Sequence, residues 1–132
     1  MLWARELLVG NSDGWDLAEA NFLDVGHQDK AITQESEFIL MDSHRHSACG
    51  SGYVLNSLWS AHIAMREPDY VSVVRAAIAF GDDTDTTACI AGGLAGIRDG
   101  LFAIPDNCRT SLRGAEVYQP LLQKLLAMRR DP

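Results

Sequence analysis

The sequence predicts an all-α fold, a compact helical bundle in a single domain of 132 residues. Apolar residues recur at intervals of three and four through most of the second half, which is typical of amphipathic helices. Only a few residues separate these segments, and such short links are typical of helices packed as neighbours. The length and a hydrophobic content of 47% suffice for one domain with a sizeable core.

The first third of the chain gives the weaker patterns. Residues 2–9 are apolar enough for a short helix, and turn-forming residues follow at 11–14. A second helix should then stop before Gly26. Residues 27–37 are polar and fit a loop or a short helix, whereas the apolar run 38–41 fits a strand or a helix.

The helical pattern is clear from residue 51 onward. Ser51 is the expected cap of a helix that Pro68 ends. Asp69 should cap the next helix, which breaks at Gly81. A helix rich in small residues then runs over about 84–98.

Two further helices are expected over residues 105–112 and 116–128. Trp59 and Tyr118 are predicted to be core residues, and His62 a core or rim residue. The final helix carries an apolar stripe formed by Val117, Leu121, Leu122, Leu125 and Leu126.

Charge and cysteine content restrict the function. A net charge of −7 argues against a nucleic-acid backbone as the main partner. No apolar run approaches the ~20 residues that span a bilayer, so no membrane partner is expected. The three cysteines Cys49, Cys89 and Cys108 lack zinc-site spacing and fit reduced thiols in a cytoplasm, with Cys89 as a buried packing residue.

An acid-rich turn precedes the small-residue helix. Three carboxylates and three hydroxyls occupy the seven positions from Gly81 to Thr87. Mg²⁺ is commonly held by one or two carboxylates with waters, so Asp83 and Asp85, with the hydroxyl of Thr86, could form one side of a cation site. The alternative is an ordinary helix cap at Asp83 or Thr84.

The glycines of the following helix favour a firmly held turn. Glycine inside a helix costs about 1 kcal/mol relative to alanine, and Gly92, Gly93 and Gly96 all lie inside this one. Close approach of another backbone is the usual reason for such glycines. We therefore expect this helix to be central and tightly packed.

Residues 81–100 resemble the C-terminal signature of the ADP-ribosylglycohydrolase family, which reads G-G-D-T-D-T-x-x-x-x-x-G-x-x-x-G. Residues 51–61 are similar to the helix that precedes this signature in the family, and the likeness covers about residues 51–127. Asp82 departs from the pattern, because the family usually has a second glycine there.

The resemblance implies a hydrolase that cleaves ADP-ribosyl glycosidic bonds, with an all-α fold and two divalent ions, Mg²⁺ or Mn²⁺. It implies that Asp83, Asp85 and Thr86 are metal ligands. It further implies that the segment Ser51, Gly52 and Tyr53 lines the cleft for an ADP-ribosylated substrate or ADP-ribose.

One part of the family pattern is absent. Family members carry an N-terminal half with a Gly-Asp-Ala stretch and a Thr-Asp-Asp-Thr metal motif, and residues 1–80 contain neither. We therefore expect a C-terminal fragment or truncated relative of a longer enzyme, with half of the dinuclear site and negligible activity alone. Apolar surface left uncovered would invite self-association.

Two other functions remain open. One is a non-catalytic helical module for interaction or metal binding. The other is a phosphotransferase of the haloacid dehalogenase type, since residues 83–87 match its Asp-x-Asp-x-Thr motif. That motif must follow a buried strand, and residues 71–80 have helical spacing instead.

A second histidine-containing motif is weaker. Asp42, His44 and His46 follow an apolar run, as in the first metal motif of amidohydrolases. That fold is a barrel of typically about 250 residues, so an exposed polar loop is the expected structure here.

Overall fold

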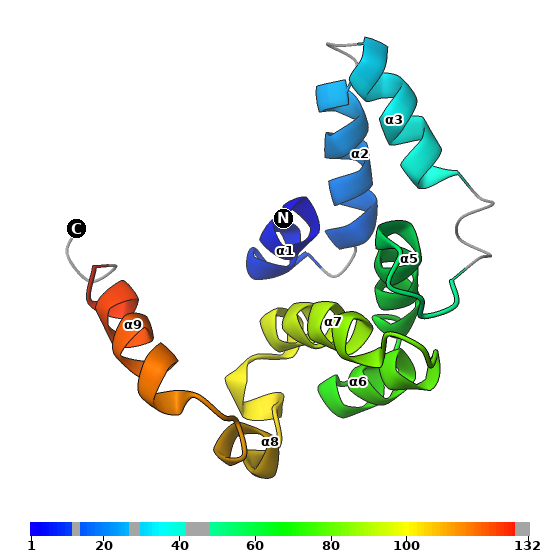
Figure 1. The fold of residues 1–132 in the computed structure, drawn as a ribbon. Coiled ribbons are helices and arrows are strands. Elements are labelled where there is room, and N and C mark those ends of the chain that lie inside the picture. Colours follow the sequence, from blue (N-terminus) through cyan, green and yellow to red (C-terminus); the bar gives the residue numbers. More distant parts are fainter. Residues whose placement is uncertain (12–13, 27–29, 42–47, 129–132) are drawn as a thin grey trace.

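A computed structural model describes residues 1–11, 14–26, 30–41 and 48–128. Figure 1 shows only helices in these stretches, which confirms the all-α prediction. The elements are α1 (Leu2–Leu8), α2 (Gly14–Gly26), α3 (Lys30–Leu40), α5 (Val54–Ala64), α6 (Tyr70–Ala79), α7 (Thr84–Asp99), the 3₁₀ turn η1 (Leu101–Ala103), α8 (Asp106–Thr110) and α9 (Ala115–Met128). Among the described helices, none combines the length and the apolar character needed to cross a membrane.

Helix α7 is the centre of the molecule, as its composition predicted. It packs against α1, α5 and α6, and α6 runs beside it over most of its length (Figure 1). The buried contacts come largely from alanines, which let the helix axes approach closely. The core cluster consists of Leu7, Ala61, Ala64, Met65, Val73, Ala77, Ala91 and Ala95.

Helices α2 and α3 form a hairpin that projects from this core (Figure 1). The sequence pattern of residues 27–41 did not decide between a loop, a strand and a helix. In the structure, Lys30–Leu40 form one continuous helix. Ser36 is buried on the inner side of this helix. Its hydroxyl donates to the carbonyl of Ile32 at 2.7 Å. The indole nitrogen of Trp59 donates to the carbonyl of Ile39 at 3.2 Å, which ties α3 to α5.

Aromatic side chains join the N-terminal helices to α5. Trp15 stacks on His62 with ring centroids 4.0 Å apart, and it contacts Trp3 and Trp59 at 4.9 and 5.1 Å. Trp59 is fully buried and His62 is partly buried, as predicted. Tyr118 differs from its prediction, because it is only half-buried on a helix that forms no extensive contact with the other described helices.

Arg98, in the last turn of α7, connects three segments. Its guanidinium forms an ion pair with Asp99 and donates to the carbonyls of Met65 and Glu67 at 2.9 and 3.0 Å. The ion pair with Asp99 is the largest cause of its raised pKa. The side chain therefore caps the end of α5 from the far end of α7.

Asp69 caps α6, as the sequence predicted. Its carboxylate accepts from the backbone N–H of Ser72 at 3.0 Å and from the hydroxyl of Ser72 at 2.8 Å. The backbone hydrogen bond from Ser72 is the largest cause of the lowered pKa of Asp69. This contribution to stability is therefore present above the unfolded-state pKa of about 3.9 and is lost as the pH falls through the lower folded-state value.

We expect the Asp69→Ala variant to have a Tm about 3 °C lower than the wild type at neutral pH. The difference should shrink as the pH falls below about 4, because the unfolded chain then takes up a proton at Asp69, whereas the folded wild type does so only at a lower pH. Thermal unfolding monitored by circular dichroism at several pH values measures both effects. An Asp69→Asn control keeps an acceptor at the cap and should show little pH dependence, and an equal Asp69→Ala loss at every pH would contradict the assignment.

Three sequence predictions in this region are wrong. Ser51 does not cap α5, because the helix starts two residues later and its N-cap position is Tyr53. Cys89 is exposed, since its face of α7 is open. No backbone presses on the helix glycines: Gly92 and Gly96 face side chains, and a methyl group on Gly93 would meet no atom within 4 Å.

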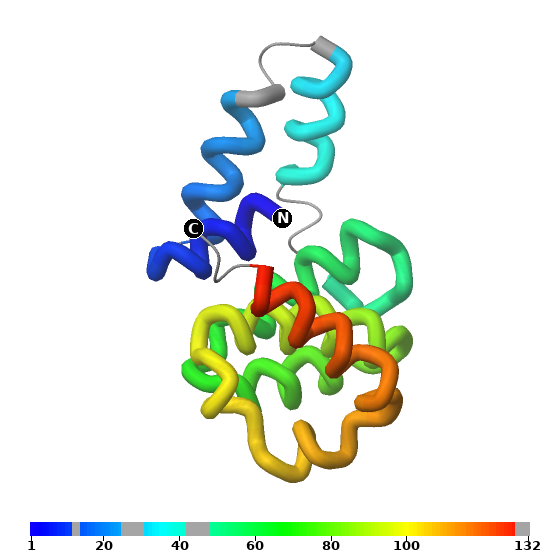
Figure 2. Tube along the Cα trace, turned by 90° about the vertical axis from the view of Figure 1, so that its left-hand side faces the viewer, coloured from blue at the N-terminus to red at the C-terminus, as the bar shows by residue number. Residues whose placement is uncertain are grey.

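Helix α9 stands apart from the other described helices. It forms no extensive contact with any of them. Figure 1 shows it at the edge of the molecule, attached through α8, and in Figure 2 the same side faces the viewer, so that α9 lies in front of the other helices. All five residues of its predicted apolar stripe are exposed. The stripe exists as predicted, but the described residues provide nothing for it to pack against.

Candidate metal site

A sharp turn joins α6 to α7 and presents the acidic residues. Gly81 and Asp82 both have positive φ, 79° and 49°. Glycine adopts this region without strain, and aspartate is one of the few other residues that tolerate it. Asp82 therefore adopts the left-handed backbone region that glycine favours.

A second segment, residues 49–53, lies against this turn. The backbone N–H of Asp83 donates to the carbonyl of Gly50 at 3.0 Å, and the N–H of Gly50 donates to Ser60 at 3.2 Å. A methyl group on Gly50 would lie 2.6 Å from the carbonyl oxygen of Gly81 and 2.8 Å from Cβ of Phe80. The segment can come this close only because residue 50 has no side chain.

The carboxylates of Asp83 and Asp85 are close neighbours. A hydrogen bond with the Asp85 carboxyl is the largest cause of the lowered pKa of Asp83, and the hydroxyl of Thr86 lowers this pKa further. The N–H of Thr86 donates to Asp85 at 3.0 Å. Asp85 and Thr86 are exposed, and Asp83 is partly exposed. These three residues thus place two carboxylates and a hydroxyl together at the N-terminus of α7.

The helix-cap explanation accounts for only part of this arrangement. Asp83 does occupy the N-cap position of α7, but its side chain makes no capping hydrogen bond. The largest causes of the lowered pKa of Asp83 are the side chains of Asp85 and Thr86, so the carboxylate interacts mainly with these two neighbours. A helix cap alone therefore does not explain why these three side chains lie together.

The predicted substrate segment reaches the same place. A methyl group on Gly52 would lie 2.6 Å from Oδ2 of Asp83, so the carboxylate rests directly on the backbone of this segment. The hydroxyl of Ser51 accepts from the amide of Asn56 at 2.8 Å and from the N–H of Tyr53 at 3.4 Å. The Tyr53 side chain is 57% exposed. The structure thus brings Gly52 against Asp83, while Ser51 and Tyr53 flank this contact on the same short segment.

The residues that support this segment carry no motif that the sequence makes evident. Gly50 and Ser60 fix its position, and the hydroxyl of Ser57 donates to the carbonyl of Ser51 at 3.2 Å. Asn56 also contacts the sulfur of Cys49 at 3.3 Å. Glycine at position 50 was a signal of close backbone approach, but the partner was about 30 positions away in the sequence.

The donor atoms suit a small hard cation. Mg²⁺ prefers carboxylate, hydroxyl and water oxygens, and it often uses only one or two carboxylates. Within the described part of the chain, no group of three or more histidine, cysteine, aspartate or glutamate side chains could hold a metal. Asp83, Asp85 and Thr86 therefore fit one side of a metal site, with the other ligand positions supplied from elsewhere.

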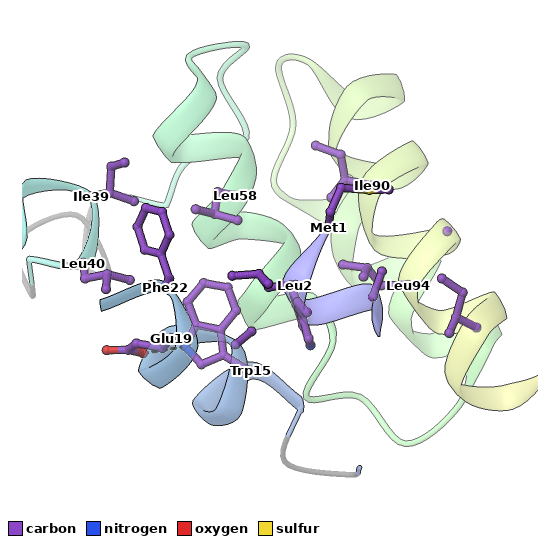
Figure 3. Close-up of a pocket in the computed structure, with 15 residues that line it drawn as sticks. Met1, Leu2, Trp15, Glu19, Phe22, Ile39, Leu40, Leu58, Ile90 and Leu94 are labelled. Carbon is purple, nitrogen blue, oxygen red and sulfur yellow. Dashed lines mark hydrogen bonds between the residues drawn. The ribbon is translucent and has the colours of Figure 1, made fainter. Parts of the chain in front are cut away.

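A large cavity among the described residues lies away from the acidic turn. Its volume is about 680 Å³, and Figure 3 shows side chains from α1, α2, α3, α5 and α7 around it. The lining is almost wholly apolar, with Leu58, Ile90 and Leu94 among its residues. Glu19, the charged residue of the lining, accepts a hydrogen bond from Trp15 at 2.9 Å. This cavity lacks the converging polar groups that hydrolysis requires.

Of two other sequence hypotheses, one is contradicted by the structure and one is not tested. The haloacid dehalogenase interpretation is wrong, because the acidic motif follows helix α6 and the described residues contain no strand. The motif of Asp42, His44 and His46 lies outside the described residues.

Comparison with known proteins gives one match. A family model described as ADP-ribosylglycohydrolase matches residues 3–132. The match extends well beyond the 51–127 segment that carried the resemblance, into α1, α2 and α3. Neither the curated proteins nor the solved structures contain a match to this chain.

Proposed function

The chain belongs to the ADP-ribosylglycohydrolase family, and from this premise we propose that it contributes the α7 side of the metal site in a hydrolase that cleaves ADP-ribosyl glycosidic bonds. The main support is the contact between two distant segments, Gly52 and the Asp83 carboxylate. An acidic turn that served only as a helix cap would not need this second segment beside it.

Each residue has a distinct role in this proposal. Asp83, Asp85 and Thr86 hold the cation, which is Mg²⁺ or Mn²⁺ and, when bound, orients ribose hydroxyls and a water molecule. Gly52 leaves room for the Asp83 carboxylate. Tyr53, exposed beside it, forms part of the wall that contacts ADP-ribose. The negative surroundings suit an oxocarbenium-like transition state.

We propose that this side of the site is incomplete by itself. Two Mg²⁺ ions need about twelve ligand positions, and the two carboxylates and one hydroxyl of the acidic turn fill only a few. The remaining positions belong to waters and to groups outside these residues. The chain alone should therefore bind a divalent ion but hydrolyse ADP-ribosylated substrates negligibly.

We expect the double variant Asp83→Asn/Asp85→Asn to lose divalent-ion binding, with an affinity at least about tenfold weaker than that of the wild type. Isothermal titration calorimetry with MgCl₂ and with MnCl₂ measures the affinity of each variant for the ion. The control is Asp82→Asn, which removes a neighbouring charge from the same turn but none of the proposed ligands. Equal losses in both variants would show non-specific attraction to an acidic surface.

Two further results separate the alternatives. Metal binding without any metal-dependent binding of ADP-ribose would favour a non-catalytic metal-binding module. Strong turnover of an ADP-ribosylated substrate by the chain alone, abolished by EDTA, would show that the site is complete and that this part of the proposal is wrong.

A further inference from the structure

The described part of the chain exposes more large apolar side chains than it buries. Its core is built mainly from alanines, whereas long aliphatic side chains lie on the surface of α9. Leu121 and Leu125 are 61% and 64% exposed, and the rest of the α9 stripe is similar. A contiguous apolar face of this kind marks an interaction surface.

A groove of matching character lies along α7. It encloses about 430 Å³ and is lined by Cys89, Gly92, Gly93, Gly96, Leu101 and Ile104, among others. A methyl group on Gly93 would meet no atom within 4 Å, so the floor of the groove is open. Small residues at intervals of three and four on one helix face allow another helix to pack closely. We call this surface the glycine groove.

We propose that a second copy of this chain covers both surfaces, with the α9 stripe of each copy packed in the glycine groove of the other. The 14 residues of α9 and the 16 of α7 are about 21 and 24 Å long, so the two helices are of similar length. An exposed area of roughly 60 Å² for each of the five stripe residues and Met128, matched by the groove and formed twice, gives about 1,400 Å². Stable protein interfaces bury about 1,200–2,000 Å².

The arrangement of α9 favours a second copy over closure on its own chain. Figure 1 shows α9 well separated from α7, and only residues 111–114 connect it to α8. Because both complementary surfaces belong to one chain, two copies can satisfy each other in a closed, two-fold symmetric pair. The net charge of −7 on each copy opposes this pairing, so the dimer should strengthen as salt screens the repulsion.

Sedimentation velocity over a wide range of chain concentrations, without metal, tests the proposal. The wild type should dimerise reversibly, and more so at higher salt. Leu121→Gln/Leu125→Gln should weaken the dimer at least about tenfold. Leu8→Gln/Val9→Gln is the matched control, because Leu8 ends α1, Val9 is its C-cap, and both are exposed (70% and 69%) without lining the glycine groove or belonging to α9.

A second variant, Gly93→Leu, tests the groove without a risk of unfolding. Its side chain enters open space, and leucine favours a helix more than glycine does, so the Tm should stay the same or rise. The dimer should weaken because the groove is filled. These readouts do not depend on the metal site, so the dimer and the proposed function can fail separately.

Several outcomes would overturn the dimer. One is a wild type that stays monomeric. Hydrogen exchange would then distinguish two explanations: the α9 amides are protected if α9 packs on its own chain, and unprotected if its apolar face binds a different protein. Another is a dimer that neither Leu121→Gln/Leu125→Gln nor Gly93→Leu weakens. A third is an equal loss in the Leu8→Gln/Val9→Gln control.

Discussion

Replacing Trp59 by alanine is expected to lower the free energy of unfolding by about 3–5 kcal/mol, the usual cost of removing a large buried aromatic side chain. Trp59 is 0% exposed and contacts both Trp15 and His62. Its loss also removes the hydrogen bond to the carbonyl of Ile39, which joins the α2–α3 hairpin to α5. Urea unfolding followed by far-UV circular dichroism and by tryptophan fluorescence measures the effect.

The Trp59→Phe variant separates the two contributions. It keeps an aromatic ring in the core but removes the indole N–H, so it should cost clearly less than Trp59→Ala. Hydrogen exchange should then show faster opening of α3 in both variants. If α3 exchanges at the wild-type rate in both, the hydrogen bond to Ile39 does not hold the hairpin.

Gly50→Ala is expected to disrupt the acidic turn as well as the fold. The alanine would have to adopt a φ of +71°, and its methyl group would press on backbone and Cβ atoms of residues 80–81. Strain and overpacking together should cost about 3 kcal/mol. Because Gly50 accepts from the N–H of Asp83, the displacement should also weaken divalent-ion binding at least about tenfold.

Gly114→Ala is a matched control for this variant. Gly114 has nearly the same backbone conformation, with a φ of +81°, but a methyl group there would meet no atom within 4 Å. It should therefore show only the cost of the backbone strain, about 1 kcal/mol, and unchanged metal binding. If the two variants lose equal stability and metal affinity, the close contact between the 49–53 segment and the turn is not what positions Asp83.

Local patterns in the sequence predicted most of the helices. Asp69 and the helical spacing after it sufficed for α6, and the acid-rich turn followed by small residues sufficed for α7. These features depend on neighbours three or four positions apart. Residues 30–40 were harder, because their helix depends on contact with α2 and on the distant Trp59.

The candidate site was predictable in its residue types but not in its assembly. Repulsion among the carboxylates near Asp83 pointed to a cation, but the residues that fix the neighbouring segment, Gly50 and Ser60, became apparent only in three dimensions. The exposure of Cys89 and of the α9 stripe could not be predicted either. Whether an apolar face is buried depends on a partner surface, and its own sequence does not supply that information.

The alanine-built interior around α7 has one further consequence. At Ala61, Ala77, Ala91 and Ala95, each 0% exposed, there is hardly any side chain left to shorten. Such an interior is vulnerable to enlargement: a valine at any of these positions would push two helix axes apart. Substitutions at these positions are therefore limited mainly by the maximum side-chain volume that fits. In an interior made of leucine and phenylalanine, they are limited mainly by the cavities that smaller side chains leave.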